Sequence, residues 1–369
     1  MQRLFQIFIL IGFLPGLSAC SVIDDTLLTE EVREFSRGVV ALSAIITQEF
    51  SLAEEVNTLG FMDNLQFQLE LGGNPDTNLK PLFSASDIAA RQSLLAALNG
   101  YAETLVAVAS GKPLSSEYSK LVGTTENLKQ LTSGHFNLAH SLSILDSDQL
   151  VNDVSVIDRL IILPERDRRL LPIIEKGGSA LSKMAILLYF DIGAVSDQSS
   201  KCSYTYPKNE LDADLSSLRL CKGGLRSIVN SAISFDTNVW KDKLAYLKTQ
   251  DQKTSRDRRI AIERLVSIQK LGQRLDQLLS ETQTSLIAMV NAHDALEKTL
   301  KDAEKSSGLP VAATSKSILF VERLRGLTGA AASIESALST LSVTNSAAQN
   351  LQPSFNTQTV TGVNDDKEL

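Results

Sequence analysis

Residues 265–300 read LVSIQKLGQRLDQLLSETQTSLIAMVNAHDALEKTL, and the spacing of their apolar side chains predicts the fold. Counting heptads from Leu265 places eleven residues on one helical stripe, and eight of them are Leu, Ile or Met. Such a repeat is typical of helices that pack side by side as in a coiled coil. The stripe consists of Leu265, Ile268, Gly272, Leu275, Leu279, Thr282, Leu286, Met289, His293, Leu296 and Leu300. We therefore expect one long helix over about residues 256–305.

A second long helix is predicted from about residue 26 to residue 71. Its apolar residues alternate steps of four and three, which places them on one face: Leu28, Val32, Phe35, Val39, Leu42 and Ile46. Gly72-Gly73-Asn74-Pro75-Asp76 ends the pattern and opens a loop.

Further helices are expected over about residues 87–109, capped by Ser84 or Ser86, and over about 115–145, 211–250 and 315–349. Pro164, Pro172 and Gly177-Gly178 are expected to break the region 148–192 into two or three shorter helices. Residues 196–209 are expected to be irregular. The Gly- and Ala-rich part of the last helix, from Gly326 to Ala332, suits close approach of another helix. The predicted fold class is mainly α, an elongated multi-helix bundle with coiled-coil-like long helices over residues 26–350.

The composition supports helices and disfavours nucleic acid as a partner. Aromatic residues make up 5% of the chain, and the net charge is −7. A chain with this charge lacks the excess of Lys and Arg that neutralises phosphates. Beyond the N-terminal run, the most apolar stretch, Met184–Val195, is too short to span a bilayer. The polar tail over 351–369 is expected to be disordered.

The N-terminus has the parts of a secretory signal. Arg3 precedes an apolar run over Leu4–Leu14, and Pro15-Gly16 then leads to Leu17-Ser18-Ala19-Cys20. This segment resembles the precursors of bacterial lipoproteins.

The resemblance implies a signal peptide over residues 1–19, cleavage before Cys20 and a lipidated tether over residues 20–25. In that class the Cys20 thiol receives a diacylglyceryl group, and the new N-terminus is usually acylated as well, often with palmitate. Ser21, in place of Asp, points to the outer membrane of a Gram-negative envelope, with the domain facing the periplasm or the cell surface.

Two cysteines remain besides Cys20. In an oxidising compartment Cys202 and Cys221 are expected to form a disulfide, with two free buried thiols as the alternative.

The sequence offers little support for catalysis. His135 and His140 lie about 140° apart on a helix and do not converge, while His293 falls on the predicted seam. No HExxH motif, nucleophile elbow or phosphate-binding loop occurs in the sequence. We expect no enzymatic activity, no cofactor and no metal.

Two arginine runs are the most prominent charged features. They comprise Arg166, Arg168 and Arg169 in one run and Arg256, Arg258 and Arg259 in the other. Each run could contact lipid headgroups or an acidic partner. The alternative is ordinary surface pairing with the interleaved Asp167 and Asp257.

These features favour a lipid-anchored envelope protein with a structural or partner-binding role, as a scaffold, adaptor or assembly factor. The partners expected are the outer-membrane lipid, through Cys20, and a protein. The alternative is a membrane-active helical protein that inserts or forms pores, and an enzyme of unfamiliar type is a third hypothesis.

Overall fold

The computed structural model describes residues 22–111, 155, 170–198, 220–250, 254–305 and 312–349 of the 369-residue chain. The helices in these ranges are α1 (Val22–Glu70), α2 (Ala85–Ala109), α5 (Leu170–Ile192), α6 (Gly224–Thr249), α7 (Ser255–Lys305) and α8 (Ala312–Gln349). The predicted signal peptide, the predicted helix over 115–145 and the tail over 351–369 lie outside the described residues.

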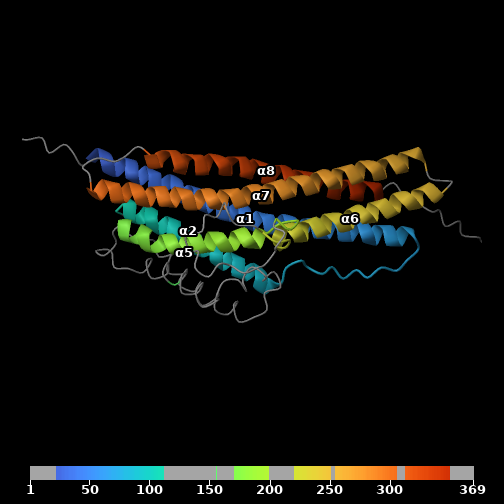
Figure 1. Ribbon diagram of the computed structural model, residues 1–369. Helices are drawn as coiled ribbons and strands as arrows, with labels where there is room; N and C mark the ends of the chain where they lie inside the picture. The colour runs from blue at the N-terminus through green and yellow to red at the C-terminus, as the bar shows by residue number, and fades with distance from the viewer. Residues whose placement is uncertain are drawn as a thin grey trace, which may run out of the picture.

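The helices pack into an elongated bundle, which confirms the predicted fold class (Figure 1). α7, with 51 residues, is about 75 Å long. α1 and α8 run beside α7 along most of this length, and α7 is antiparallel to both. On the remaining side, α2 and α5 cover one half of the bundle and α6 covers the other (Figure 1).

The two ends of the bundle are built from different helices. We call the end that contains the start of α1 the near end and the opposite end the far end. At the near end Thr29 Oγ1 donates to the Ala109 carbonyl at the end of α2. The far end holds the end of α1, the end of α6 and the start of α7. Lys243 of α6 pairs there with Glu70 of α1 at 2.7 Å.

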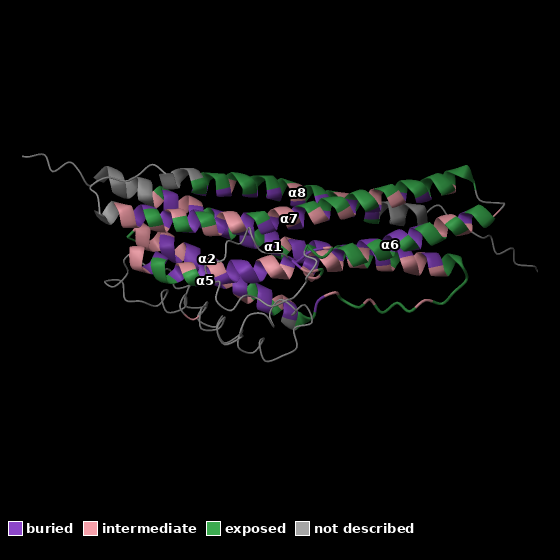
Figure 2. Cartoon of the chain, viewed as in Figure 1, coloured by how far each residue is buried: buried purple, intermediate pink, exposed green. Residues whose placement is uncertain are grey.

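The predicted seam of α7 faces the interior. Of the eleven predicted positions, Leu265 and Gly272 are half-buried and the others are buried. Leu271, Leu278 and Ala292 are buried as well, because α7 packs against α1, α5, α6 and α8 and so buries more than a two-position stripe. Figure 2 shows the buried residues along the inner faces of the helices.

α1 starts at Val22, four residues earlier than predicted, so only residues 20 and 21 of the predicted tether precede it. Its predicted apolar face is buried from Val32 to Ile46. After Glu70 the chain returns in an extended loop. The Glu54 carboxylate holds this loop on α1 by accepting hydrogen bonds from the backbone N–H groups of Leu82 and Phe83.

Ser84, and not Ser86, caps α2. The Ser84 hydroxyl accepts from Asp87 N at 3.1 Å, and the Asp87 carboxylate accepts from Ser84 N at 3.0 Å. This reciprocal pair is a capping box, which satisfies two backbone N–H groups at the start of the helix.

The predicted breaks at Pro172 and Gly177-Gly178 are wrong, because α5 is continuous from Leu170 to Ile192. Pro172 lies in the first turn, where its missing N–H group costs no helical hydrogen bond. Gly177 and Gly178 have a packing role instead. A Cβ atom at Gly177 would overlap the Tyr101 ring, and one at Gly178 would lie 2.9 Å from the His293 ring.

The junction between α5 and α6 also differs from the prediction. Residues 220–223 are not helical, and α6 begins at Gly224. Gly193 and Gly224 have φ values of +70° and +69°, and a Cβ atom at Gly193 would overlap the carbonyl oxygen of Gly223. Hydrogen bonds join Ala194 and Gly223 in both directions, so the end of α5 is fixed beside the start of α6.

The glycines of α8 do not allow close helix approach within the described bundle. Gly326 and Gly329 are exposed, and a Cβ atom at either would have no atom within 4 Å. α8 contacts the bundle through a narrow stripe that consists of Phe320, Leu324, Leu327, Ala331, Ile334, Leu338 and Leu341. Both glycines lie off this stripe.

A pair of identical substitutions tests these glycine environments. Gly177→Ala should lower the free energy of unfolding by about 1–3 kcal/mol, because the buried Tyr101 ring must move. Gly329→Ala should raise it by up to about 1 kcal/mol, because alanine stabilises an exposed helix and meets nothing there. Urea unfolding followed by circular dichroism measures both. Shifts of the same sign would contradict the described packing.

Candidate functional site

The described arginine run begins α7 at the far end of the bundle. Arg256, Arg258 and Arg259 are all exposed. Asp257 forms no ion pair with these three arginines; its carboxylate instead accepts from Thr254 N at 2.9 Å and so caps the helix. Arg259 pairs with Glu263 at 2.8 Å, and this hydrogen bond and charge raise the pKa of Arg259. Neither Arg256 nor Arg258 has an ion pair with another described residue.

Apolar side chains continue the exposed face on which Arg258 lies. Ile262 and Val266 follow Arg258 at intervals of four, so the three side chains share one face of α7. Ile262 is 50% exposed and Val266 is 43% exposed. We call Arg258, Ile262 and Val266 the far-end face. Arginine is enriched in protein–protein interfaces, and the two aliphatic side chains beside Arg258 would add apolar contact area.

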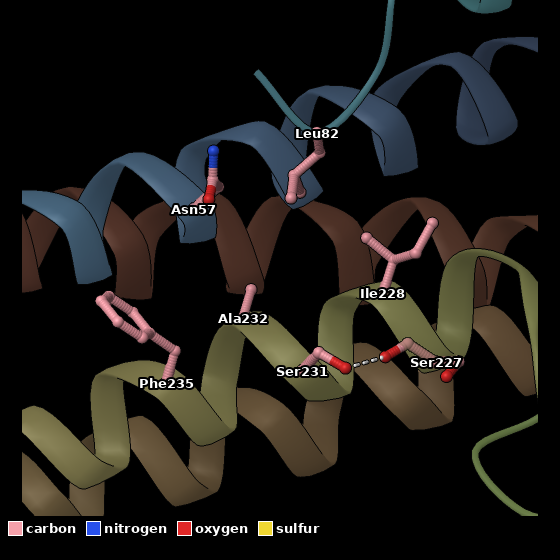
Figure 3. A pocket seen from close by; sticks show the side chains of 7 residues that line it. All are labelled: Asn57, Leu82, Ser227, Ile228, Ser231, Ala232 and Phe235. Atoms are coloured by element: carbon pink, nitrogen blue, oxygen red, sulfur yellow. Dashed lines mark hydrogen bonds between the residues drawn. The ribbon is translucent and has the colours of Figure 1, made fainter. Parts of the chain in front are cut away.

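A shallow groove lies between α1, α6 and the loop that follows α1 (Figure 3). It measures about 230 Å³, and its lining consists of Asn57, Leu82, Ser227, Ile228, Ser231, Ala232 and Phe235. Its polar groups serve the fold, since Ser231 Oγ donates to the Ser227 carbonyl and Asn57 Nδ2 donates to the Lys80 carbonyl. The groove therefore offers apolar contact more than polar recognition.

Several polar groups are buried in the core, and of these Thr282 and His293 were predicted to lie on the α7 stripe. Tyr101 Oη and His293 Nε2 lie 2.7 Å apart, and burial lowers the pKa of His293 to about 4, so this histidine is neutral at pH 7. Thr282 donates to Glu49 at 2.5 Å, and burial raises the pKa of Glu49 to about 8. These groups are enclosed by packed helices and connect them.

A buried ionic cluster lies near the far end. Asp63 of α1 accepts hydrogen bonds from Arg264 of α7 and from Trp240 of α6, and Asp236 lies beside them. A sequence signal for part of it exists, since Asp63 falls among the core-facing positions of α1 and Arg264 directly precedes the predicted seam residue Leu265. Each of these positions places a charge beside an apolar face, but neither identifies its partner in the sequence.

The described part of the chain contains neither a candidate metal cluster nor a candidate membrane-spanning helix. No group of three or more His, Cys, Asp or Glu residues there could hold a metal ion. None of the helices it contains is both long enough and apolar enough to cross a bilayer.

The remaining predicted site residues are only partly covered. Cys20, Cys202, Arg166, Arg168 and Arg169 lie outside the described residues. Cys221 is described and lies three residues before α6.

Comparisons of the sequence with family models, with curated proteins and with solved structures gave no match.

Proposed function

We propose that this chain is a lipid-anchored scaffold of the bacterial envelope, which holds a protein-binding surface away from the outer membrane. The proposed anchor is Cys20, after removal of residues 1–19. The proposed role is binding and positioning, without catalysis.

The course of α1 is the observation that carries this proposal. α1 begins at Val22, two residues after Cys20, and ends at Glu70 at the far end. Its 49 residues span about 73 Å. The same helix packs against α2, α6, α7 and α8, so the predicted lipid site and the far end are joined through one packed element. Such a connection supports a spacer that sets the distance between membrane and partner.

The far-end face is the surface that we propose for the partner, together with Arg256 and Arg259. Planar guanidinium groups can each form two hydrogen bonds with a carboxylate, which favours an acidic protein surface. Ile262 and Val266 would be buried in the contact. Arg166, Arg168 and Arg169 remain a second proposed contact for anionic groups.

We further propose the disulfide between Cys202 and Cys221. Hydrogen bonds hold residues 197–198 beside residues 220–222. Gln198 N donates to the Leu220 carbonyl at 2.9 Å, and Lys222 N donates to the Asp197 carboxylate at 2.7 Å. A disulfide between Cys202 and Cys221 closes a loop of about 20 residues, which in the loop-entropy view stabilises the fold by about 3 kcal/mol.

Lipidation is tested on the full chain expressed in a Gram-negative host. Mass spectrometry of the mature N-terminus should show cleavage before Cys20 and an acylated thiol, and Cys20→Ser should move the protein out of the membrane fraction. Ser21→Ala, which keeps the thiol, serves as the control and should remain membrane-bound. An unmodified Cys20 would refute the anchor.

The disulfide is tested by peptide mapping without reductant, which should recover Cys202 and Cys221 in one linked species. Cys202→Ser should lower the free energy of unfolding by about 2–4 kcal/mol. Reductant should destabilise the parent protein to the same level and leave the variant unchanged. Two free thiols in freshly prepared protein would exclude the bond.

The partner surface is tested with a photo-crosslinking residue at position 255 in the full-length, membrane-anchored chain. The double variant Arg256→Glu/Arg258→Glu should reduce the crosslinked product about fivefold, since two surface contacts of about 0.5 kcal/mol each are lost. Arg323→Glu/Arg325→Glu is the matched control, because it makes the same charge change with the same spacing at exposed positions of α8, away from the far-end face.

Equal crosslinking in both double variants would show that the far-end face is an ordinary solvated surface. Permeabilisation of liposomes by the purified chain would favour a membrane-active protein over a scaffold.

A further inference from the structure

One buried carboxylate and the arginine that pairs with it connect four helices near the far end. Asp63 Oδ2 of α1 accepts from Trp240 Nε1 of α6 at 2.6 Å and from Arg264 Nη2 of α7 at 2.7 Å. The same guanidinium donates through Nη1 to the Leu341 carbonyl of α8 at 2.8 Å. Loss of this centre would therefore release contacts between all four helices at once.

A second acid, Asp236, is buried beside Asp63. Asp236 precedes Trp240 by one turn of α6, and its side chain is almost fully enclosed, at 1% exposure. α6 approaches α1 closely here, since a Cβ atom at Gly60 would lie 3.1 Å from the Asp236 Cβ atom. Asp236 Oδ1 has no hydrogen-bond partner among the described residues.

The charges of this cluster balance only if the two carboxyl groups share one proton. Among the described residues, Arg264 is the cation that pairs with Asp63, and one cation neutralises one carboxylate. Lys243 of α6 lies 4.8 Å from the centre of the Trp240 ring, but it pairs with Glu70 of α1, so these two cancel each other. α8 contributes the Leu341 carbonyl, which adds no positive charge.

Burial and the neighbouring Asp63 charge raise the pKa of Asp236 to about 8, while Arg264 acts in the opposite direction. A protonated Asp236 can donate to Asp63, which leaves one negative and one positive charge in the packed interior. Deprotonation would leave an uncompensated charge in a buried, packed site, which is strongly unfavourable.

We propose that Asp63, Asp236, Trp240 and Arg264 form a proton-dependent latch, which keeps the far end closed while the two acids share a proton and loosens it when that proton is lost. Loosening starts where Asp236 meets α1, because water or counterions must enter there to solvate the second carboxylate. The near end does not contain this cluster and stays packed. The latch operates whether or not Cys20 is lipidated or a partner is bound.

Trp240 provides a direct probe, because it is the single tryptophan of the chain and its indole N–H is part of the latch. In the purified full-length chain, raising the pH from 6 to 9.5 should shift its fluorescence to longer wavelength, with a midpoint near pH 8. Asp236→Asn mimics the neutral acid and should keep the short-wavelength emission throughout. An unchanged parent spectrum, or the same titration in Asp236→Asn, would overturn the proposal.

Glu49→Gln is the matched control. It neutralises the other buried carboxyl group with a raised pKa, which bonds to Thr282 and not to Trp240, so the fluorescence midpoint should remain near pH 8. A midpoint that disappears in Glu49→Gln would assign the transition to Glu49 and overturn the latch.

Hydrogen exchange of the parent protein tests the proposal even if Asp236→Asn fails to fold. After correction for the intrinsic pH dependence, amides of residues 233–247 in α6 should lose tenfold or more of their protection between pH 6.5 and 9. Amides of residues 174–188 in α5 should lose less than twofold. Equal loss in both helices would indicate general destabilisation and would overturn a local latch.

Discussion

Burial of the α7 stripe is the constraint on which the other packing depends. α7 contacts α5 in one half of the bundle and α6 in the other, and it meets α1 and α8 in both. Each buried Leu, Ile or Met on the stripe contributes about 1.5–3 kcal/mol relative to an exposed position. α5 and α6 can share this one partner because the junction at Gly193 and Gly224 places them one after the other along the same side.

Polar residues on the inner face of α7 fix how the surrounding helices align with it. Arg264, Thr282 and His293 meet Asp63, Glu49 and Tyr101, and these partners belong to α1 and α2. An apolar seam alone tolerates a shift of one turn, whereas such a shift would leave all these buried groups without their partners. Burying these polar groups costs free energy of folding, but it leaves only one alignment in which all of them are paired. Buried polar residues have the same role in coiled coils.

Apolar periodicity was enough to predict α1, α7 and the helical fold class, because burial on one face leaves a direct mark on the sequence. The predictions for glycine were wrong in two opposite ways: Gly177 was expected to break a helix but allows close packing, and Gly329 was expected to allow close packing but does not. Gly177 is packed against a ring and Gly329 faces open space, yet in the sequence each is only a residue without a side chain inside a helical pattern. The pairing of Asp63 with Arg264 joins residues 201 positions apart, which no local pattern contains. The arginine run at 256–259, which was predicted to contact anionic groups, lies at the far end. It lies there because α7 begins at Ser255, directly after its cap at Thr254.

The α5–α6 junction has a consequence for how this sequence can vary. Residues 199–219 connect Gln198 to Leu220 in the sequence, and the Gln198 N–H donates directly to the Leu220 carbonyl. Because Gln198 and Leu220 are already in contact, the described contacts of the bundle do not depend on how many residues connect these two positions. Loop length adds only slowly to the entropic cost of closure. The junction is therefore a natural point for insertion, where a lineage could acquire or exchange a segment, or an engineer could graft a domain, without repacking a single helix.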